Sequence, residues 1–485
     1  MFKKATLLLL IGAMLTSAAS CGTTSDVGTD TTTSGDTTTA APEGYDYSGK
    51  NYNGKTFRVF GMDDIYTMHM KFDRDESNGE ILNDAIYDRN RLVEDKLNVV
   101  IEETTVATFA EVNNTLGTSI LSGDDICDLA LIPPSTCCGI IIEGYFKDLR
   151  SIGSWDLDAE WYNQSYNDAV TLNGKMYFGM SDATIALTDG IWALFFNEDM
   201  MENLKMDKPY DLVRDGTWTT DKLISYLKAA ASLNGDEDWS WHMNGNAVYG
   251  LSTVGTTHYR VTNAMGEKLV ENQDGKLVFT AGTDRFYSVI DKLRTLMDTS
   301  SGAVYFGGTN GGDFNMESGQ YLAPFPSQRT LFQTAEICKT QSFRELEFDY
   351  GVVPYPKYDE NQSSYYSPIF EACVAFSIPI TAPDAEFSAS VWDALAYEGG
   401  QSVVPAYREV TLEQKGLRND DSIEMLGIIT DSAFPDAGSM FGISGSFRTE
   451  FNTEITNNTG AMASIIDKHK TSIQEKIDEL VDAIG

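Results

Sequence analysis

Basic residues are scarce in this sequence of 485 residues. Lysine and arginine together number 35, against 72 aspartates and glutamates, which leaves a formal net charge of −37. Nucleic acids are bound through basic surfaces that meet their phosphates, and anionic membranes attract clusters of lysine and arginine. The charge balance therefore argues against a nucleic-acid partner and against a patch for anionic lipids. The negative net charge favours solubility. It does not indicate the charge of the ligand, because the local field of a pocket can oppose the net charge.

The side chains that most often hold metals are few and poorly spaced. The four histidines show no ligand spacing, and no C-x-x-C or G-x-S-x-G motif is present. Five cysteines remain besides Cys21, an odd number that does not make a disulfide framework. The neighbours Cys137 and Cys138 have no histidine nearby, so we interpret them as small buried side chains rather than a metal or redox site. We expect no metal and no cofactor.

The N-terminal segment lacks an apolar run long enough to span a membrane. Lys3 and Lys4 precede an apolar run over residues 5–19, whereas about 20 residues are needed to cross the hydrocarbon core. A charged start, a short apolar run and a small-residue exit are typical of a secretory signal peptide. We assign the signal peptide to residues 1–20.

The exit of this segment, Ala18-Ala19-Ser20-Cys21-Gly22, resembles the lipobox of bacterial lipoproteins. In that family the cysteine thiol is acylated, for example with palmitate, and the peptide is cut before it. The resemblance implies that Cys21 is lipidated; the alternative is an ordinary cleavage site beside a chance cysteine. Residues 21–44 are rich in Thr, Ser, Gly and Asp and cannot bury enough surface to offset their ordering entropy. They predict a disordered tether.

Strands and helices alternate after the tether. Strands are predicted at residues 56–60, 99–101 and 127–132, and helices at 81–97 and 112–121, where apolar residues recur at helical spacing. This order predicts an open α/β sheet. Further strands are predicted at residues 176–179, 191–196, 350–353 and 371–378. Further helices are predicted at residues 197–204, 218–231, 387–397, 422–432 and 461–484. A chain of this length suits two lobes better than one simple core.

The order of several short motifs is similar to that in the family-one extracellular solute-binding proteins, which include maltodextrin-binding and other sugar-binding receptors. The motifs are Asp-Leu-Ala at 128–130, Gly-Tyr-Phe-Lys-Asp-Leu at 144–149, Leu-Asn-Gly-Lys-Met-Tyr-Phe-Gly at 172–179, Leu-Phe-Phe-Asn-Glu-Asp at 194–199, Gly-Thr-Trp-Thr at 216–219, Gly-Gln-Tyr-Leu-Ala at 319–323 and Tyr-Gly-Val-Val-Pro-Tyr-Pro at 350–356. They extend over nearly the whole mature chain.

The resemblance implies a two-lobed α/β fold of the type II periplasmic-binding-protein class, with a hinge and a cleft between the lobes. It implies chain crossings near residues 181–190, 350–356 and 404–408. The first lobe would comprise residues 45–183 plus 354–404, and the second 190–350 plus 408–485. The ligand would lie in the cleft and favour lobe closure.

The function that the resemblance implies is that of a solute receptor for an ABC importer, anchored by lipid on the extracellular face of the cell membrane. We expect a monomer that binds a small solute and delivers it to permease subunits, and the resemblance favours a carbohydrate as that solute. Two alternatives stay open: a lipid-anchored enzyme acting on extracellular polysaccharide, and a receptor that signals to a membrane sensor.

Candidate ligand-binding residues follow from two rules. Ligands of open α/β lobes lie past the carboxyl ends of strands and at chain crossings, and sugars need bidentate polar groups and aromatic faces. The residues that satisfy both rules are Asp63 and Asp64 after the first strand, Ser135 after the third, Asp189 and Trp192 at the first crossing, Phe325 and Arg329 after the turn at 319, Tyr355 and Glu371 at the second crossing, and Tyr407 and Arg408 at the third.

Each candidate has a structural alternative. An aspartate after a strand is often a helix cap or turn former, a tryptophan is often core, and the two arginines could form ion pairs that stabilise a lobe. Trp239 and Trp241, in an aspartate-rich loop, could form a sugar platform, although we interpret them as loop anchors.

Overall fold

The computed structural model describes residues 44–307, 322–408, 417 and 419–484. The chain divides into two compact units, Met1–Tyr45 and Asp46–Gly485, and all helices and strands of the described residues belong to the second. The expected signal peptide, the expected lipidation site Cys21 and nearly all of the expected tether lie outside the described residues. Among the described residues, no helix is both long and apolar enough to cross a membrane.

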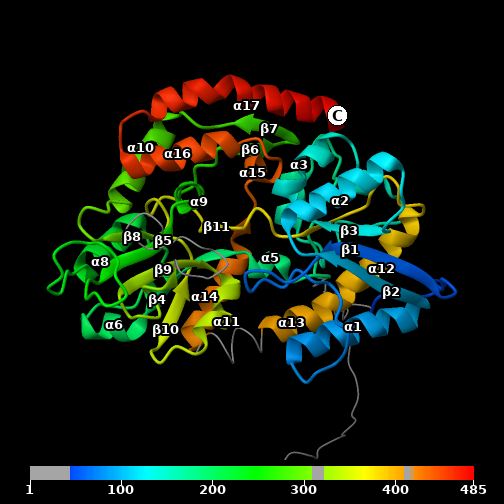
Figure 1. Ribbon diagram of the computed structural model, residues 1–485, viewed down its shortest axis with the longest axis horizontal. Coiled ribbons are helices and arrows are strands. Elements are labelled where there is room, and N and C mark those ends of the chain that lie inside the picture. The colour runs from blue at the N-terminus through cyan, green and yellow to red at the C-terminus, as the bar shows by residue number, and fades with distance from the viewer. Residues whose placement is uncertain (1–43, 308–321, 409–416, 418, 485) are drawn as a thin grey trace, which may run out of the picture. The chain divides into compact units, whose positions relative to one another are not determined.

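The first sheet has the strand order β12-β3-β1-β2 and is mostly parallel. Figure 1 shows β3, β1 and β2 of this sheet. Its strands are β1 (Lys55–Met62), β2 (Val99–Val106), β3 (Leu129–Ile132) and β12 (Ala375–Ser377). β1 pairs in parallel with β2 and β3, and β12 is antiparallel to β3. The helices packed around this sheet are α1 (Ile81–Leu97), α2 (Phe109–Ser122), α3 (Pro134–Ile142) and α12 (Ala385–Glu398). Because β1, β2 and β3 are parallel, their carboxyl ends meet at one edge.

The second sheet has the order β10-β4-β9-β5-β8. Its strands are β4 (Trp192–Asn197), β5 (Tyr249–Val254), β8 (Val304–Gly307), β9 (Thr330–Glu336) and β10 (Tyr350–Val353). β5 is parallel to both β8 and β9, while β4 is antiparallel to β9 and β10. The start of β4 therefore lies at the same edge as the carboxyl ends of the other four strands. Every residue of these strands is buried.

The remaining helices and short strands surround the two sheets and the crossings. The remaining helices are η1 (Leu149–Ser151), α4 (Gln164–Val170), α5 (Ala186–Asp189), α6 (Glu198–Asn203), α7 (Tyr210–Arg214), α8 (Thr220–Ala230), α9 (Thr257–Ala264), α10 (Asp284–Leu296), η3 (Ile337–Lys339), α11 (Thr340–Phe343), the π-helix η4 (Gly399–Val403), α13 (Val404–Ala406), α14 (Asp420–Asp431), α15 (Ala437–Met440), α16 (Gly445–Asn457) and α17 (Met462–Ile484). The remaining strands are β6 (Val270–Gln273), β7 (Lys276–Phe279), β11 (Ser367–Pro368) and β13 (Ala433–Phe434).

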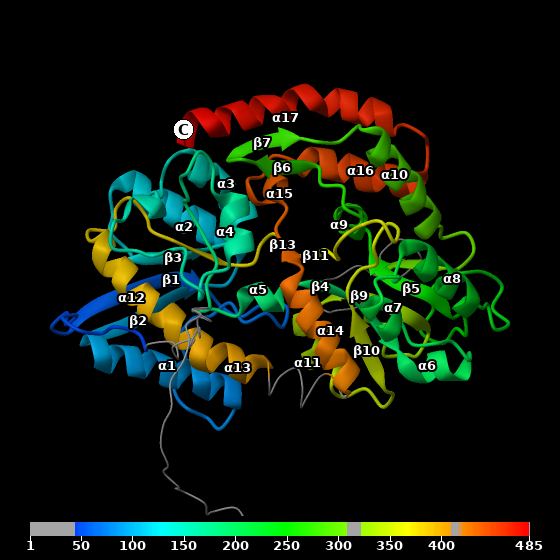
Figure 2. The same cartoon turned by 180° about the vertical axis from the view of Figure 1, so that it is seen from behind.

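The segments that pass between the two sheets lie together in the middle of the unit, where Figures 1 and 2 show α5, β11 and β13. β11 pairs in parallel with β13, and Ile369 forms a bridge with Ile191 at the start of β4. Two glycines allow this close packing. A Cβ at Gly190 would lie 2.0 Å from the Cys373 Sγ, and a Cβ at Gly399 would lie 2.1 Å from a backbone oxygen of Asp182.

The structure corrects one predicted strand. Residues 176–179 form no strand; only Gly179 makes an isolated bridge, to Phe376 of β12. The backbone of this segment is bound by separate partners instead of one strand, since Met176 donates to the Asp148 carboxylate at 3.0 Å and the Tyr177 carbonyl accepts from the Ser377 hydroxyl at 2.6 Å. The other predicted strands and helices overlap observed ones, although β12 is shorter than the predicted 371–378.

Candidate ligand-binding site

A buried aromatic and charged group lies at the edge where β4 begins and β9 ends. Trp192 pairs with Glu336 across the two strands, and both side chains are buried. Arg260 of α9 places its guanidinium 4.4 Å from the centre of the Trp192 ring. Tyr355, just past β10, is buried near Arg260 and Glu336. The Trp192 indole nitrogen has no hydrogen-bond partner among the described residues, so this edge holds an unused buried donor.

Glu371, on the chain between β11 and β12, is held by two arginines. Its Oε2 lies 2.8 Å from the Arg260 Nη2 and accepts a hydrogen bond of 2.8 Å from the Tyr259 hydroxyl. Its Oε1 pairs with Arg448 of α16, whose guanidinium lies 4.0 Å from the centre of the Tyr259 ring. Burial alone would raise the pKa of Glu371, but Arg260 and Arg448 outweigh burial and hold that pKa well below its usual range. Glu371 is therefore a permanently charged acceptor at the second crossing.

Three partly exposed aromatic rings lie beside this charged group. Tyr66 follows β1, Phe109 begins α2 just after β2, and Phe370 precedes Glu371. The ring centres of Tyr66 and Phe109 are 6.4 Å apart, and those of Phe109 and Phe370 are 6.2 Å apart. We call Tyr66, Phe109 and Phe370 the aromatic group. It joins the carboxyl-end edge of the first sheet to the second crossing, and aromatic faces of this kind pack on the C–H surfaces of flat ligands.

The aromatic group was not predicted from the sequence, although two of its residues satisfy the rule that ligand residues follow strand ends. Tyr66 and Phe109 come within a few residues of the ends of β1 and β2. The predicted second strand covered only residues 99–101, whereas β2 continues to Val106, so Phe109 was not recognised as following a strand. Phe370 stands next to the selected Glu371.

Asp63, Asp64 and Ser135 lie at the expected edge of the first sheet, where the structure also shows local partners. Asp63 accepts a hydrogen bond of 2.6 Å from the Thr105 hydroxyl. Asp64 accepts one of 2.8 Å from the Lys71 backbone and pairs with Arg74 at 3.1 Å. Ser135 lies in the first turn of α3 and is partly exposed. Both aspartates are exposed, so their contacts are compatible with turn formation as well as with ligand binding.

Asp189 and Tyr407, selected at different crossings, are in direct contact. The Tyr407 hydroxyl donates to Asp189 Oδ1, while the Oδ2 of the same carboxylate lies 2.8 Å from the His69 Nδ1. Asp189 is fully buried. The first and third crossings are therefore tied to each other and to the loop after β1. Arg408, the next residue after Tyr407, is exposed.

Phe325 and Arg329 lie at the opposite edge of the second sheet from Trp192. Phe325 packs against Phe343 and Phe348, with ring centres 5.2 and 5.4 Å away. Arg329 directly precedes β9 and donates from Nε to the Ala247 carbonyl at 2.9 Å. The seven-residue length of β9 separates the two edges by ~20 Å. The structure does not bring these two residues together with the other candidates, because they precede an unrecognised strand.

Trp241 is a loop anchor in the structure. It is buried in a cluster with Ala247, Tyr249 and Tyr305, against which Trp239 packs. The Arg329 guanidinium lies 4.2 Å from the centre of the Trp241 ring. These contacts fasten the loop to the second sheet.

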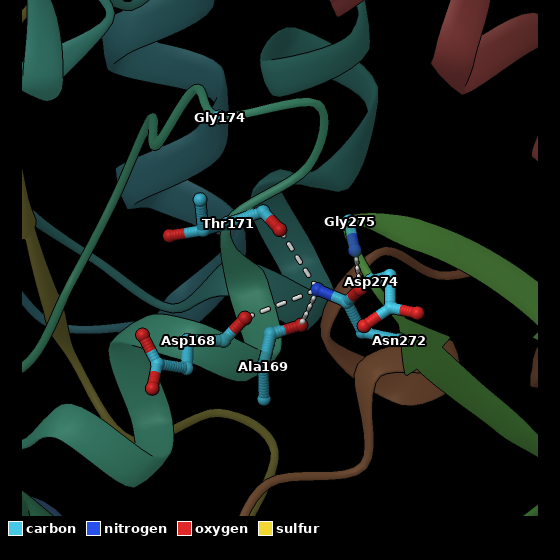
Figure 3. Close-up of a pocket in the computed structure, with 7 residues that line it drawn as sticks. All are labelled: Asp168, Ala169, Thr171, Gly174, Asn272, Asp274 and Gly275. Carbon is cyan, nitrogen blue, oxygen red and sulfur yellow. Dashed lines mark hydrogen bonds between the residues drawn. The ribbon is translucent and has the colours of Figure 1, made fainter.

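A surface cavity of ≈ 460 Å³ beside the β6–β7 hairpin is not a comparable site (Figure 3). Asn272 enters it and donates from Nδ2 to the carbonyls of Asp168, Ala169 and Thr171 at 3.0, 3.1 and 2.8 Å. Its Oδ1 accepts a hydrogen bond of 2.9 Å from the Gly275 backbone. The polar groups of Asn272 are thus used to fasten the hairpin to the end of α4, and no selected residue lines the cavity.

Comparison by sequence identifies no relative: no family model matches the chain, and no curated protein matches it. Comparison with solved structures does find proteins of the same fold. A cyclo/maltodextrin-binding protein in complex with maltotetraose matches with a TM-score of 0.58 at 14% identity, covering 87% of this chain and 97% of that one. The likeness shows that the chain has the two-lobed α/β fold of the periplasmic-binding-protein class, as predicted.

Two further solved structures show the same fold. The galacto-N-biose/lacto-N-biose I-binding protein of the ABC transporter from Bifidobacterium longum has a TM-score of 0.57 at 13% identity, covering 89% of this chain and 99% of that one. The maltose-maltodextrin-binding protein of Alicyclobacillus acidocaldarius has a TM-score of 0.55 at 13% identity, covering 87% and 100%. All three are described as binding proteins.

Proposed function

We propose that this chain is the solute receptor of an ABC importer and that its solute is a carbohydrate. The observation that carries the proposal is the fold that it shares, over almost the full length of both chains, with proteins described as binding maltodextrin and lacto-N-biose. The aromatic group beside Glu371 supports it, since it combines ring faces with a charged acceptor where the two sheets approach each other. The chain is a binding protein and not an enzyme in this proposal.

The ligand site that we propose consists of the aromatic group together with part of the sequence-based selection. The retained residues are Asp63, Asp64, Ser135, Trp192, Tyr355 and Glu371. Asp189 and Tyr407 support this site from the crossings, and Phe325, Arg329 and Arg408 are left out. Contacts from both lobes exist together only when the lobes are closed, so the ligand shifts the equilibrium toward closure by its differential affinity. The permease subunits would then recognise the closed form.

The lobe boundaries are part of the proposal. We retain residues 45–183 and the segment up to 404 for the first lobe, and 190–350 with 408–485 for the second. However, Lys357 exchanges backbone hydrogen bonds with Trp218 and Thr220, and Gln362 donates to the Ala264 carbonyl. Because these partners belong to the helices of the second sheet, we move the second crossing from 350–356 to the region after residue 366.

The location that we propose is the extracellular face of the cell membrane, with a lipid on Cys21 and a monomeric receptor at the end of a tether. Such a tether would keep the receptor close to its permease and raise the effective concentration there. Mass spectrometry of the exported protein tests the anchor, because Cys21 should carry a lipid. Cys21→Ser should release the protein from the cells; a Cys21→Ser variant that stays bound would contradict the anchor.

Ligand-dependent melting tests the solute. The purified full chain would be heated with a panel of mono- and oligosaccharides, and the solutions examined for cleaved sugar. A ligand at 100 times its dissociation constant should stabilise the chain by about 2.7 kcal/mol. A flat response to every sugar would refute the carbohydrate solute, and cleaved sugar would refute the receptor in favour of a polysaccharide-active enzyme.

A pair of variants tests the site. Phe109→Ala removes the central ring of the aromatic group and should weaken binding of the best sugar by about tenfold. Tyr87→Ala is the matched control, because Tyr87 is a partly exposed aromatic residue of α1 that contacts Arg91 rather than the site. Equal affinity of the two variants would place the ligand elsewhere.

A further inference from the structure

One buried carboxylate ties three separate segments of the chain together. Asp189 ends α5 on the first crossing and is fully buried. Its Oδ2 accepts a hydrogen bond of 2.6 Å from the His69 backbone nitrogen and lies 2.8 Å from the His69 Nδ1. Its Oδ1 accepts from the Tyr407 hydroxyl on the third crossing. His69 thus connects the loop after β1 of the first sheet to the two crossings that Asp189 and Tyr407 belong to.

The loop that carries His69 also carries Tyr66 of the aromatic group. Tyr66 and Thr67 have positive φ angles of 58° and 70°, a conformation that non-glycine residues adopt only at a cost. Contacts outside the loop hold it: the Lys339 ammonium donates to the Tyr66 carbonyl, and the Gln341 amide lies 3.4 Å from the His69 Nε2. The position of Tyr66 therefore depends on how firmly the loop is anchored.

Charged groups of both signs face His69. Asp189 and Asp64 are the nearby anions, and Arg74 is the nearby cation from the chain just after the loop. Lys71 and Arg89, the latter on α1, line the same small space. The remaining titratable neighbours of Asp189 are Cys338, Cys373 and Tyr407, whose pKa values burial raises well above the ordinary range, so all three are neutral.

Among these charged groups, Asp189 has the largest effect in favour of the protonated form of His69. Burial alone would lower the pKa of His69, but the charge of Asp189 and its hydrogen bond outweigh burial, and the pKa is raised. A charge-assisted hydrogen bond is about twice as strong as a neutral one. The link between the loop and the crossings is accordingly stronger when His69 is protonated.

We propose that His69 is a positioning residue through which pH controls ligand binding: protonated His69 clamps its loop on Asp189 and holds Tyr66 in the aromatic group, whereas neutral His69 keeps only neutral hydrogen bonds to Asp189 and holds the loop less firmly. The proposal rests on the proposed function, because it concerns regulation of that same site. Ligand affinity should fall as the pH rises through the titration of His69.

Hydrogen exchange of the full chain without ligand tests the clamp. After correction for intrinsic rates, peptides covering residues 63–71 should exchange about tenfold faster at pH 8 than at pH 6. His69→Gln should abolish the difference, whereas His242→Gln, which alters an exposed histidine, should retain it. Equal exchange at both pH values in the unmodified chain, or a pH difference that survives in His69→Gln, would overturn the proposal.

Binding of maltotetraose, measured at the same two pH values, tests the consequence. Its dissociation constant should rise severalfold from pH 6 to pH 8 in the unmodified chain and in His242→Gln, and stay constant in His69→Gln. A constant value in the unmodified chain would overturn the role of His69 in binding. Absence of binding at both pH values would count against the carbohydrate solute, while the exchange result would still decide whether His69 holds the loop.

Discussion

Asp189 and Glu371 are two carboxylates on neighbouring crossings, and they are held by different kinds of partner. Glu371 lies between Arg260 and Arg448, which stay charged at every pH of interest. Asp189 is held by His69 and Tyr407, of which only the histidine can carry a positive charge. The difference teaches that the choice of cation decides whether a crossing responds to pH. The charges at the Glu371 junction stay constant as the pH changes, whereas the charge at the Asp189 junction changes when His69 titrates.

The largest expected effect is that of Glu371→Ala. The substitution would leave two largely buried guanidinium groups without their shared anion, and breaking a buried pair in this way costs about 3–5 kcal/mol. Urea unfolding would measure the loss, with Glu371→Gln as a control of similar shape that should lose less. A loss below ~1 kcal/mol would show that the cluster does not stabilise the chain.

Asp189→Asn should have a smaller effect. The amide keeps one acceptor oxygen of similar geometry but loses the charge opposite His69, so we expect a loss of about 1–3 kcal/mol in the free energy of unfolding. Asp63→Asn is the matched control, since Asp63 is exposed and should change stability by less than about 0.5 kcal/mol. If Asp189→Asn cost as much as Glu371→Ala, the contrast between the two junctions would be wrong.

The pH dependence of stability sharpens the contrast further. The pKa of His69 is raised in the folded chain above 6.5, so its stabilisation is complete below pH 6.5 and is lost as the pH rises through the folded pKa. The pKa of Glu371 is lowered from 4.5, so its stabilisation is lost only in acid, as the pH falls through the folded pKa. Of these two contributions, only that of His69 should change between pH 5.5 and 8.5.

The measurement for this third prediction is the difference in unfolding free energy between the unmodified chain and His69→Gln. The difference is needed because burial raises the pKa of Glu103 to about 7 and that of Asp182 to about 6, and both groups also lose stability as the pH rises. The difference should shrink by on the order of 1 kcal/mol toward alkaline pH. A difference that is flat with pH would remove His69 as the source.

The smallest effect is expected at an exposed ion pair. Lys55 Nζ lies 2.9 Å from Asp384 Oδ2, with 39% and 48% of the two side chains exposed. Solvent screens such pairs, so Lys55→Ala should cost less than about 1 kcal/mol, and high salt should reduce that cost. Asp384→Ala should cost more, because Asp384 also accepts from the Phe387 backbone as the cap of α12. A larger loss for Lys55→Ala than for Asp384→Ala would contradict this order.

The two sheets differ in how well the sequence predicted them. β1, β3 and the helix α1 overlap their predicted ranges because an apolar run or a helical apolar stripe marks each one. β5, β8 and β9 were not predicted, although they form the centre and one edge of the second sheet. β9 shows why: Gln333 and Thr334 are fully buried, and the Thr334 hydroxyl bonds to Thr253 of β5 at 2.6 Å. A strand that buries polar residues among other strands has no continuous apolar signature of its own.

The contacts among the residues of the proposed site were predicted only in part, because a short local sequence does not show tertiary partners. Crossings were expected to carry ligand residues, and the structure does bring Asp189 to Tyr407, and Trp192 to Glu371 through Arg260. Arg260, Arg448 and His69 were not selected, because nothing in their local sequence shows which anion they meet. Phe325 and Arg329 were selected as residues after a turn, but the unrecognised β9 places them at the far edge of its sheet.

By itself the sequence determined the α/β class, the two-lobed organisation and the expectation of a signal and tether, because these depend on composition, periodicity and order along the chain. Tertiary structure alone decided which partners face Asp189 and Glu371. Those partners come from segments 77–218 residues apart, and a histidine or arginine looks the same in sequence whichever carboxylate it meets. The pKa of each group depends on which charged groups lie close to it in the folded chain. The difference between the Asp189 junction, whose charge changes with pH, and the Glu371 junction, whose charge does not, therefore exists only in the folded chain.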